Sequence, residues 1–259
     1  MATTPRLDGP RMPPAYGGPP RQLVIFLHGY GADGNDLVSL GGYWKARLPG
    51  AAFVAPNAPE FSEVVPQGRQ WFSLGNYDPN RLRRDPAAAA EEYERRLADV
   101  EKAAPALNAF MDAELERYGL NDDALALVGF SQGTMMSLHV SLRRERQCAA
   151  VIGYSGALCG AGETPTATRS RPPVFLFHGD ADEVVPIHAL FLGIEGLAAA
   201  GVSVEWHICS GIGHGIAPEA LEIGGRFLAD SFSGVRKPAD VSQIGGSRDG
   251  PTPPDSQQQ

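Results

Sequence analysis

The 259-residue chain has few cysteines and no long apolar run. Its three cysteines, Cys148, Cys159 and Cys209, lack C-x-x-C spacing, so we expect free thiols in a reducing, cytoplasmic setting. No apolar run approaches the roughly 18 residues that span a bilayer, and residues 1–20 have no apolar segment typical of a secretory signal. These absences argue against a disulfide framework and against stable membrane insertion.

An excess of positive charge is missing as well. The net charge of -8 argues against nucleic acid or an anionic membrane as the main partner. The phosphate-loop signatures G-K-[ST] and G-x-G-x-x-G are absent, and no metal-ligand spacing is apparent, so we expect neither a cofactor nor a metal. The hydrophobic content of 43% is enough for one sizeable core, which fits a single α/β domain.

Proline and glycine mark the two ends of the chain. Residues 1–20 contain six prolines, which disfavour helix and central strand alike, so we expect a flexible arm there. Residues 234–259 are mostly Ser, Gly, Pro and Gln, and we expect a disordered tail. The folded domain is therefore predicted to span residues 21–233.

Apolar runs of strand length alternate with helical segments through this domain. The expected strands cover residues 22–27, 51–55, 124–128, 149–154, 173–177 and 202–208. The expected helices cover residues 37–47, 85–118 with a kink or restart at Pro105, 134–144, 187–200 and 217–232. This alternation predicts a mainly parallel central sheet with helices on both faces, whose strand ends form one edge.

The most informative motif is G-F-S-Q-G at residues 129–133, between an expected strand and an expected helix. In that context G-x-S-x-G predicts a nucleophile elbow, in which a strained turn holds the serine hydroxyl up at the strand end. The flanking glycines, Gly129 and Gly133, would let neighbouring chain approach closely. The alternative is a tight turn whose Ser131 only caps the helix.

A nucleophilic serine needs a base, and six histidines compete for that role. We prefer His214, which lies in a Gly-flanked loop after the last strand. The other five are expected in structural or unsuitable places: His28 and His178 before Gly at strand ends, His139 on the helix after Ser131, His188 at a helix start and His207 inside a strand.

The base in turn needs an orienting acid from a strand end between Ser131 and His214. Asp180 and Asp182 both qualify, and Glu183 is a weaker third choice. We prefer Asp182 because it lies further into the loop, and we expect Asp180 to hold the turn. The resulting order of serine, aspartate and histidine is that of α/β-hydrolases.

Two long connections shape the expected site. Residues 56–85 form a segment that should be functional or disordered. Trp71 and Phe72 within it favour a functional role in substrate binding, although packing onto the core is an equal alternative. Residues 155–172 are too short for a large helical cap, so we expect an open, shallow pocket for short- to medium-chain esters or thioesters.

Six motifs occur together in a characteristic order: L-H-G-Y-G-A-D-G from residue 27, P-N-A-P from 56, W-F at 71–72, G-F-S-Q-G from 129, H-G-D-A-D from 178 and G-H at 213–214. In this the chain resembles the phospholipase/carboxylesterase family of α/β-hydrolases, over residues 22–232. That family includes bacterial carboxylesterases and the acyl-protein thioesterases.

The resemblance implies an α/β-hydrolase fold without a large cap domain, and a triad of Ser131, Asp182 and His214. It also implies that the backbone N–H groups of Tyr30 and Gln132 form the oxyanion hole. The expected reaction is hydrolysis of a small-molecule carboxylic ester by a monomer or homodimer. Alternatives are an acyl-protein thioester or lysophospholipid substrate, and a non-catalytic binding module.

Three positions depart from the family pattern. Tyr30 stands where many relatives have Leu, and its side chain is expected to narrow the pocket. Thr134 stands where Gly is common and should crowd the helix start, while Glu183 stands where Pro is frequent. None of these departures removes a catalytic group.

Overall fold

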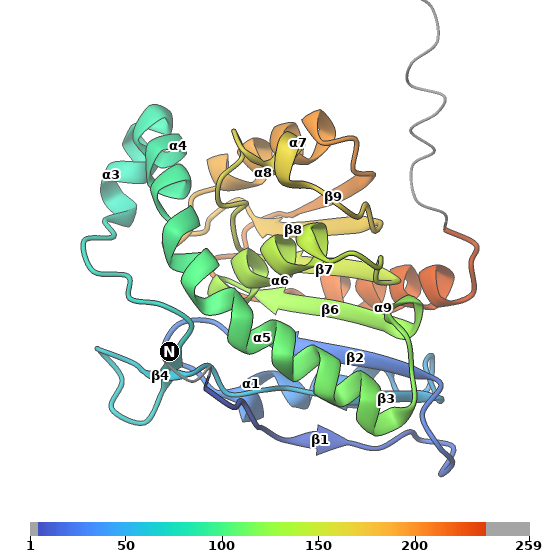
Figure 1. The fold of residues 1–259 in the computed structure, drawn as a ribbon. Helices are drawn as coiled ribbons and strands as arrows, with labels where there is room; N and C mark the ends of the chain where they lie inside the picture. Colours follow the sequence, from blue (N-terminus) through green and yellow to red (C-terminus); the bar gives the residue numbers. More distant parts are fainter. Residues whose placement is uncertain (1–4, 237–259) are drawn as a thin grey trace, which may run out of the picture.

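A seven-stranded sheet forms the centre of the computed structural model, which describes residues 5–236 (Figure 1). The strands lie in the order β1-β3-β2-β6-β7-β8-β9, and every pairing is parallel except that of β1 with β3. Their bounds are β1 Arg11–Met12, β2 Gln22–Leu27, β3 Ala51–Val54, β6 Leu125–Phe130, β7 Ala150–Tyr154, β8 Val174–Gly179 and β9 Val204–Cys209. The predicted, mainly parallel sheet is confirmed.

The inner strands are buried on both faces, which explains their continuous apolar sequences. In β2, Leu23, Ile25 and Leu27 belong to one core cluster, whereas Val24 and Phe26 belong to the other. Successive side chains of a strand point to opposite faces, so one apolar run supplies two hydrophobic layers.

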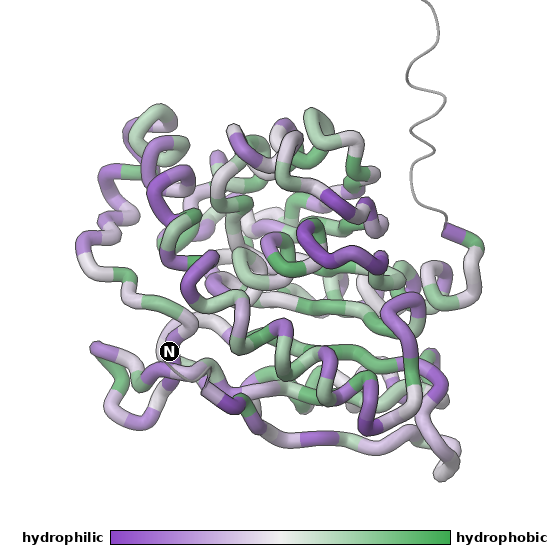
Figure 2. The backbone as a smooth tube through the Cα atoms, viewed as in Figure 1, coloured by the Kyte–Doolittle hydropathy of each residue, from purple (hydrophilic) through white to green (hydrophobic). Residues whose placement is uncertain are grey.

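Helices cover both faces of the sheet, as predicted. One core cluster includes side chains of α3 (Pro79–Arg84), α4 (Pro86–Arg95), α5 (Leu97–Tyr118), α6 (Gln132–Arg143) and α8 (His188–Ala199). The other includes side chains of α1 (Gly34–Val38), α2 (Gly41–Trp44) and α9 (Pro218–Phe232). In Figure 1, α5 and α6 lie in front of the sheet, and Figure 2 shows hydrophobic residues gathered along the inner strands.

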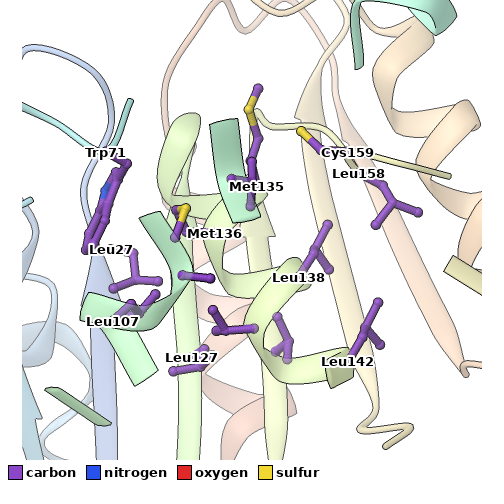
Figure 3. Packing of buried hydrophobic residues seen from close by; sticks show 14 of the residues in the cluster. Leu27, Trp71, Leu107, Leu127, Met135, Met136, Leu138, Leu142, Leu158 and Cys159 are labelled. Atoms are coloured by element: carbon purple, nitrogen blue, oxygen red, sulfur yellow. The ribbon is translucent and has the colours of Figure 1, made fainter. Parts of the chain in front are cut away.

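In helix α6, every residue except Arg143 is buried. Its Met135, Met136 and Leu138 lie in the same packed layer as Leu107 of α5 and Leu127 of β6 (Figure 3). All three cysteines are free thiols, as the sequence predicted, and all three are buried. Within residues 5–236, no helix is both long and apolar enough to cross a bilayer.

The expectation of a flexible arm is wrong for residues 5–20. Strand β1 adds to the sheet edge beside β3, a place where flanking prolines are tolerated. The guanidinium of Arg11 also donates to both carboxylate oxygens of the buried Glu114, at 3.0 and 2.7 Å. This partly buried charge pair anchors the segment. Residues 1–4 lie outside the described chain, as does the expected tail from residue 237 onward.

Two helix predictions are corrected. The helix expected over 37–47 is two short helices, α1 and α2, which are interrupted at Ser39 and Leu40, and the glycines Gly41 and Gly42 that open α2 lower its helix propensity. Pro105 lies inside α5 without ending it. The break comes earlier, between α4 and α5 at Arg96, whose guanidinium donates to the carbonyls of Ser73 and Leu74, 2.7 and 2.6 Å away.

The two long connections differ in content. Residues 56–85 contain a small hairpin, β4 (Glu60–Phe61) with β5 (Arg69–Gln70), followed by α3. Residues 155–172 contain only the four-residue helix α7 (Thr164–Ala167). A short 3₁₀ turn, η1 (Asp122–Ala124), precedes β6. No large cap domain is therefore present within the described residues, as predicted.

Candidate active site

The site lies where the strand order of the sheet reverses. The chain passes from β2 outward to β3 and then returns to β6 on the other side of β2. In open α/β sheets, such a switch point leaves a crevice beyond the carboxyl ends of the two strands. The loop after β2 begins with His28 and Gly29, and the turn after β6 carries Ser131. The two segments touch, since a Cβ placed on Gly29 would lie 3.2 Å from the Cβ of Ser131.

Ser131 occupies a strained backbone conformation between β6 and α6. Its φ of 55° and ψ of -116° lie in a region that L-residues rarely adopt. The turn is close-packed: a Cβ on Gly133 would lie 1.8 Å from the carbonyl oxygen of Leu27, and one on Gly129 would lie 2.3 Å from Gly133 itself. Only glycine fits either position, which is the geometry predicted from the G-x-S-x-G pattern.

Thr134 reinforces the turn, a role that the sequence reasoning missed. Its Oγ1 lies 2.9 Å from the carbonyl oxygens of both Gly129 and Tyr154. The crowding expected at this position is absorbed by two glycines, Gly153 and Gly156, that face the Thr134 side chain. The hydroxyl thus joins the start of α6 to the ends of β6 and β7.

Asp182 and His214 come together, although 31 residues separate them in the sequence. The Nδ1 atom of His214 lies 2.9 Å from Oδ2 and 3.1 Å from Oδ1 of Asp182. The Asp182 side chain is fully buried, while that of His214 is 18% exposed. Oδ1 of Asp182 also accepts hydrogen bonds from the backbone N–H groups of Val184 and Val185, each at 2.9 Å.

These contacts keep Asp182 ionised. Burial alone would raise the pKa of its carboxyl, but the hydrogen bond and charge of His214 and the two backbone N–H donors outweigh that effect. The net result is a pKa below the ordinary value of 3.8. A buried carboxylate in this state accepts the Nδ1–H of an imidazole and leaves Nε2 unprotonated, as a general base requires.

Asp180, the other candidate acid, joins two loops. Its carboxylate accepts from the backbone N–H of Gly211 at 2.6 Å and from the hydroxyl of Ser210 at 3.2 Å. Asp180 therefore holds the turn through contacts with the loop that carries His214, rather than through its own neighbours. Among residues 5–236, no hydrogen bond joins the Asp180 carboxylate to His214.

Ser131 and His214 are linked through Phe130. The Phe130 ring packs against the His214 imidazole with 4.8 Å between centroids. Among the described residues, the Ser131 hydroxyl forms no hydrogen bond with another side chain; such bonds are often long before substrate binds. Ser155, a second strained serine with φ of 46°, donates to the carbonyl of Gly215 beside His214 at 3.4 Å. The sequence offered no signal for the roles of Phe130 and Ser155.

The histidines expected to be structural are buried. Nε2 of His28 accepts the backbone N–H of Ala58 at 3.0 Å, so its Nδ1 carries the proton toward the Gly29 carbonyl. His178 has Nε2 within 2.8 Å of the Val185 carbonyl, in the loop that holds Asp182. Burial lowers the pKa of both imidazoles, so they remain neutral.

The two expected oxyanion donors lie on either side of the crevice. Within residues 5–236, the backbone N–H groups of Tyr30 and Gln132 donate to no protein acceptor. The Gln132 N–H opens α6, where the helix dipole favours negative charge. The Tyr30 hydroxyl reaches Glu63, 3.4 Å away, in the loop between β4 and β5.

The side chain of Gln132 holds the long 56–85 segment against the elbow. Its Oε1 accepts the Trp71 backbone N–H at 3.1 Å, and its Nε2 donates to the Phe72 carbonyl at 2.8 Å. Trp71 Nε1 donates to the His28 carbonyl at 3.0 Å. Both aromatic side chains are buried, which favours the alternative that they anchor the segment, and they line a cavity of about 490 Å³ beside α5. Direct contact with substrate stays a prediction.

Comparison with known proteins gives a consistent picture. The sequence profile of the Phospholipase/Carboxylesterase family matches residues 15–231. Acyl-protein thioesterase 1 of Saccharomyces cerevisiae is 28% identical, covering 83% of this chain and 95% of that protein. Esterase YpfH of Escherichia coli is also 28% identical, covering 79% and 80%.

Solved structures extend the comparison. The crystal structure of esterase PE8 is 36% identical, covers 87% of this chain and 99% of that one, and superposes with a TM-score of 0.77. SOBER1 of Arabidopsis thaliana covers 81% and 98% with a TM-score of 0.66, but at 21% identity it shows the fold alone. These likenesses confirm the predicted α/β-hydrolase fold.

Proposed function

Because the chain belongs to the phospholipase/carboxylesterase family of hydrolases, we propose that it is a serine carboxylesterase whose triad is Ser131, His214 and Asp182. The observation that carries the proposal is the hydrogen bond of 2.9 Å between His214 Nδ1 and a buried, ionised Asp182, in the loops beside the strained Ser131 turn. A serine that merely capped α6 would not require this strained turn. Ser131 also makes no side-chain hydrogen bond that would cap the helix.

The proposed reaction has two steps. His214 Nε2 takes the proton of Ser131 as the serine Oγ attacks the acyl carbonyl, and it then gives that proton to the leaving alcohol. Asp182 holds the Nδ1–H tautomer and stabilises the imidazolium that forms. Water, deprotonated by His214, then attacks the acyl-enzyme; as the bond to Ser131 Oγ breaks, His214 returns the proton to that oxygen and the acid is released. The Tyr30 and Gln132 N–H groups would hold the oxyanion in both steps.

The absence of a large cap within the described residues supports an accessible site and therefore short- to medium-chain acyl esters. A thioester substrate is the second candidate, supported by the likeness to proteins named acyl-protein thioesterase. A thioester is cleaved by the same sequence of steps, with a thiol that takes the proton from His214 as the leaving group.

The test is hydrolysis of p-nitrophenyl esters from acetate to palmitate, and of acyl thioesters matched in chain length. Wild type should favour short and medium chains, and Ser131→Ala should lose activity by a factor on the order of 10⁴ or more. Ser170→Ala is the matched control, because Ser170 is also buried but its hydroxyl donates to the Ser141 carbonyl near the other end of α6, and this variant should keep most activity.

Two outcomes would decide against the proposal. Activity that survives in Ser131→Ala would remove Ser131 as the nucleophile. A wild-type protein inactive on every ester and thioester would point to a binding module instead. The ratio of ester to thioester kcat/KM then assigns the substrate class.

A further inference from the structure

Three metal-ligating side chains converge at the outer edge of the sheet. His207 and Cys209 alternate along β9, so both point to the same face of the strand. Glu219 lies in the first turn of α9 on that side. The nitrogen, sulfur and carboxylate atoms of the three residues all lie within 4.8 Å of one another, and His207 Nε2 is 3.1 Å from Glu219 Oε1.

The fold fixes part of this cluster and leaves part of it adjustable. The Cys209 side chain is buried, and its backbone pairs with Gly179 of β8. The His207 ring packs near Phe177, with 6.2 Å between centroids. The side chains of His207 and Glu219 are 35% and 58% exposed, so an ion can enter from solvent and both groups can rotate toward it.

We propose that His207, Cys209 and Glu219 form a binding site for a divalent transition-metal ion of the Zn²⁺ class. One imidazole nitrogen, one thiolate and one carboxylate form a donor set that Zn²⁺ accepts, with water as the fourth ligand. Hard cations such as Mg²⁺ and Ca²⁺ instead require mostly oxygen ligands.

The geometry needs only a small adjustment. Tetrahedral Zn²⁺ with bonds of about 2.0–2.3 Å places its ligand atoms about 3.5 Å apart. The present separations of up to 4.8 Å must therefore shorten, which side-chain rotation of the exposed Glu219 and His207 can achieve around a fixed Cys209.

This site has no sequence signature, which explains why a metal was not expected. His207 and Cys209 are two residues apart on a strand, and Glu219 follows ten residues later on a helix. The three residues come together only because α9 packs near β9 in the fold. The proposed triad uses none of the three. The carbonyl of Cys209 accepts hydrogen bonds from the backbone N–H groups of Asp180 and Ile212, at 3.2 and 3.4 Å. An ion bound to Cys209 and Glu219 would therefore connect the start of the loop that carries His214 to α9.

The experiment uses the full chain after removal of any affinity tag. Zn²⁺ affinity is measured by competition with a chromophoric chelator, and Co²⁺ is added separately as a spectroscopic probe. We expect one ion per chain with micromolar or tighter affinity, and a thiolate-to-cobalt charge-transfer band. Saturating Zn²⁺ should raise the Tm by roughly 5 °C or more, because the ion binds only the folded state.

Matched variants decide whether this cluster is the site. Cys209→Ser should abolish the cobalt band, while Cys148→Ser keeps it. His207→Gln and Glu219→Gln should each weaken Zn²⁺ binding by at least about tenfold, whereas His188→Gln and Glu222→Gln should not.

The proposal fails if wild type binds no Zn²⁺ at micromolar concentration, or if Cys209→Ser retains the cobalt band. Should Cys209→Ser not fold, the exposed pair His207 and Glu219 decides, and unchanged affinity in both of their variants would overturn the site.

Discussion

The elbow at residues 129–133 and the segment at 56–85 meet at Gln132, but they are held by different means. The elbow is fixed by backbone: its glycines touch carbonyl groups at distances that exclude any side chain. The segment is fixed by side chains: Gln132 and Arg96 bind it from elsewhere in the chain, and its own Trp71 is buried. The first kind of order is signalled by a five-residue motif, whereas the second has no local signal in the sequence.

The largest expected effect comes from adding one methyl group to the elbow. In Gly133→Ala the new Cβ would lie 1.8 Å from the Leu27 carbonyl oxygen, and neither backbone can move without disturbing β2 or α6. We expect a loss of more than about 4 kcal/mol in the free energy of unfolding, or no folded protein.

The control for this variant is Gly42→Ala in α2, where a Cβ would meet nothing within 4 Å. That change should be neutral or stabilise the protein by about 0.5–1 kcal/mol. Urea unfolding of both variants is the measurement. Equal stability of the two variants would show that the elbow is not rigid.

This contrast also explains what the sequence could predict. The parallel sheet, the helices on both faces and the strained turn at Ser131 follow from local patterns, because strand runs and glycines act over a few residues. The pairing of Asp182 with His214 was expected from the order of motifs, and the structure brings the two together.

Other features could not be predicted because their causes lie far away in sequence. Strand β1 pairs with β3, and its Arg11 binds Glu114, 103 residues away. The helix break falls at Arg96 rather than at Pro105 because Arg96 turns toward the carbonyls of the 56–85 segment. The packing of Phe130 on His214 likewise needs both loops in place.

The second prediction concerns Arg96, which holds the 56–85 segment at Ser73 and Leu74. The Arg96 guanidinium is almost fully buried and donates to Ser73, Leu74, Glu92 and Asp99. Arg96→Met leaves the Glu92 carboxylate and two carbonyls without this donor, and we expect a loss of about 3–5 kcal/mol. Limited proteolysis should also cut the segment faster.

Arg95→Met provides the matched comparison. Arg95 pairs with the same Glu92, but its side chain is 56% exposed, so its removal should cost no more than about 1 kcal/mol. If both variants lose the same stability, burial of the Arg96 network is not what holds the segment.

The third prediction concerns the hydrogen bonds by which Gln132 joins the elbow to the 56–85 segment. Gln132→Leu keeps the backbone N–H that opens α6 but leaves the Trp71 N–H and the Phe72 carbonyl unpaired in the core. We expect a loss of about 1–3 kcal/mol, together with a lower kcat/KM on esters as the segment moves. Gln147→Leu, which also removes a side-chain bond to a backbone N–H, should leave kcat/KM unchanged. An unaltered kcat/KM in Gln132→Leu would show that the placement of the 56–85 segment does not affect catalysis.

The smallest effect concerns the helix that follows the elbow. Burial, with help from the charge of Arg143, lowers the pKa of His139 on α6 from 6.5 to about 3. The unfolded chain therefore binds a proton at this residue below pH 6.5 while the folded chain does not, so stability must fall as the pH drops from 6.5 toward 3.

His139 alone should contribute about 1 kcal/mol of this loss between pH 7.5 and pH 5.5. In His139→Leu and His139→Gln that portion should vanish, and the pH dependence measured by urea unfolding should flatten by the same amount in both. The two substituted side chains pack differently, but neither of them titrates. Equal flattening of the pH dependence in both variants therefore assigns the effect to protonation of His139. A slope identical to that of wild type would mean that His139 takes up a proton in the folded protein, and that the elbow helix is more open to water than its burial implies.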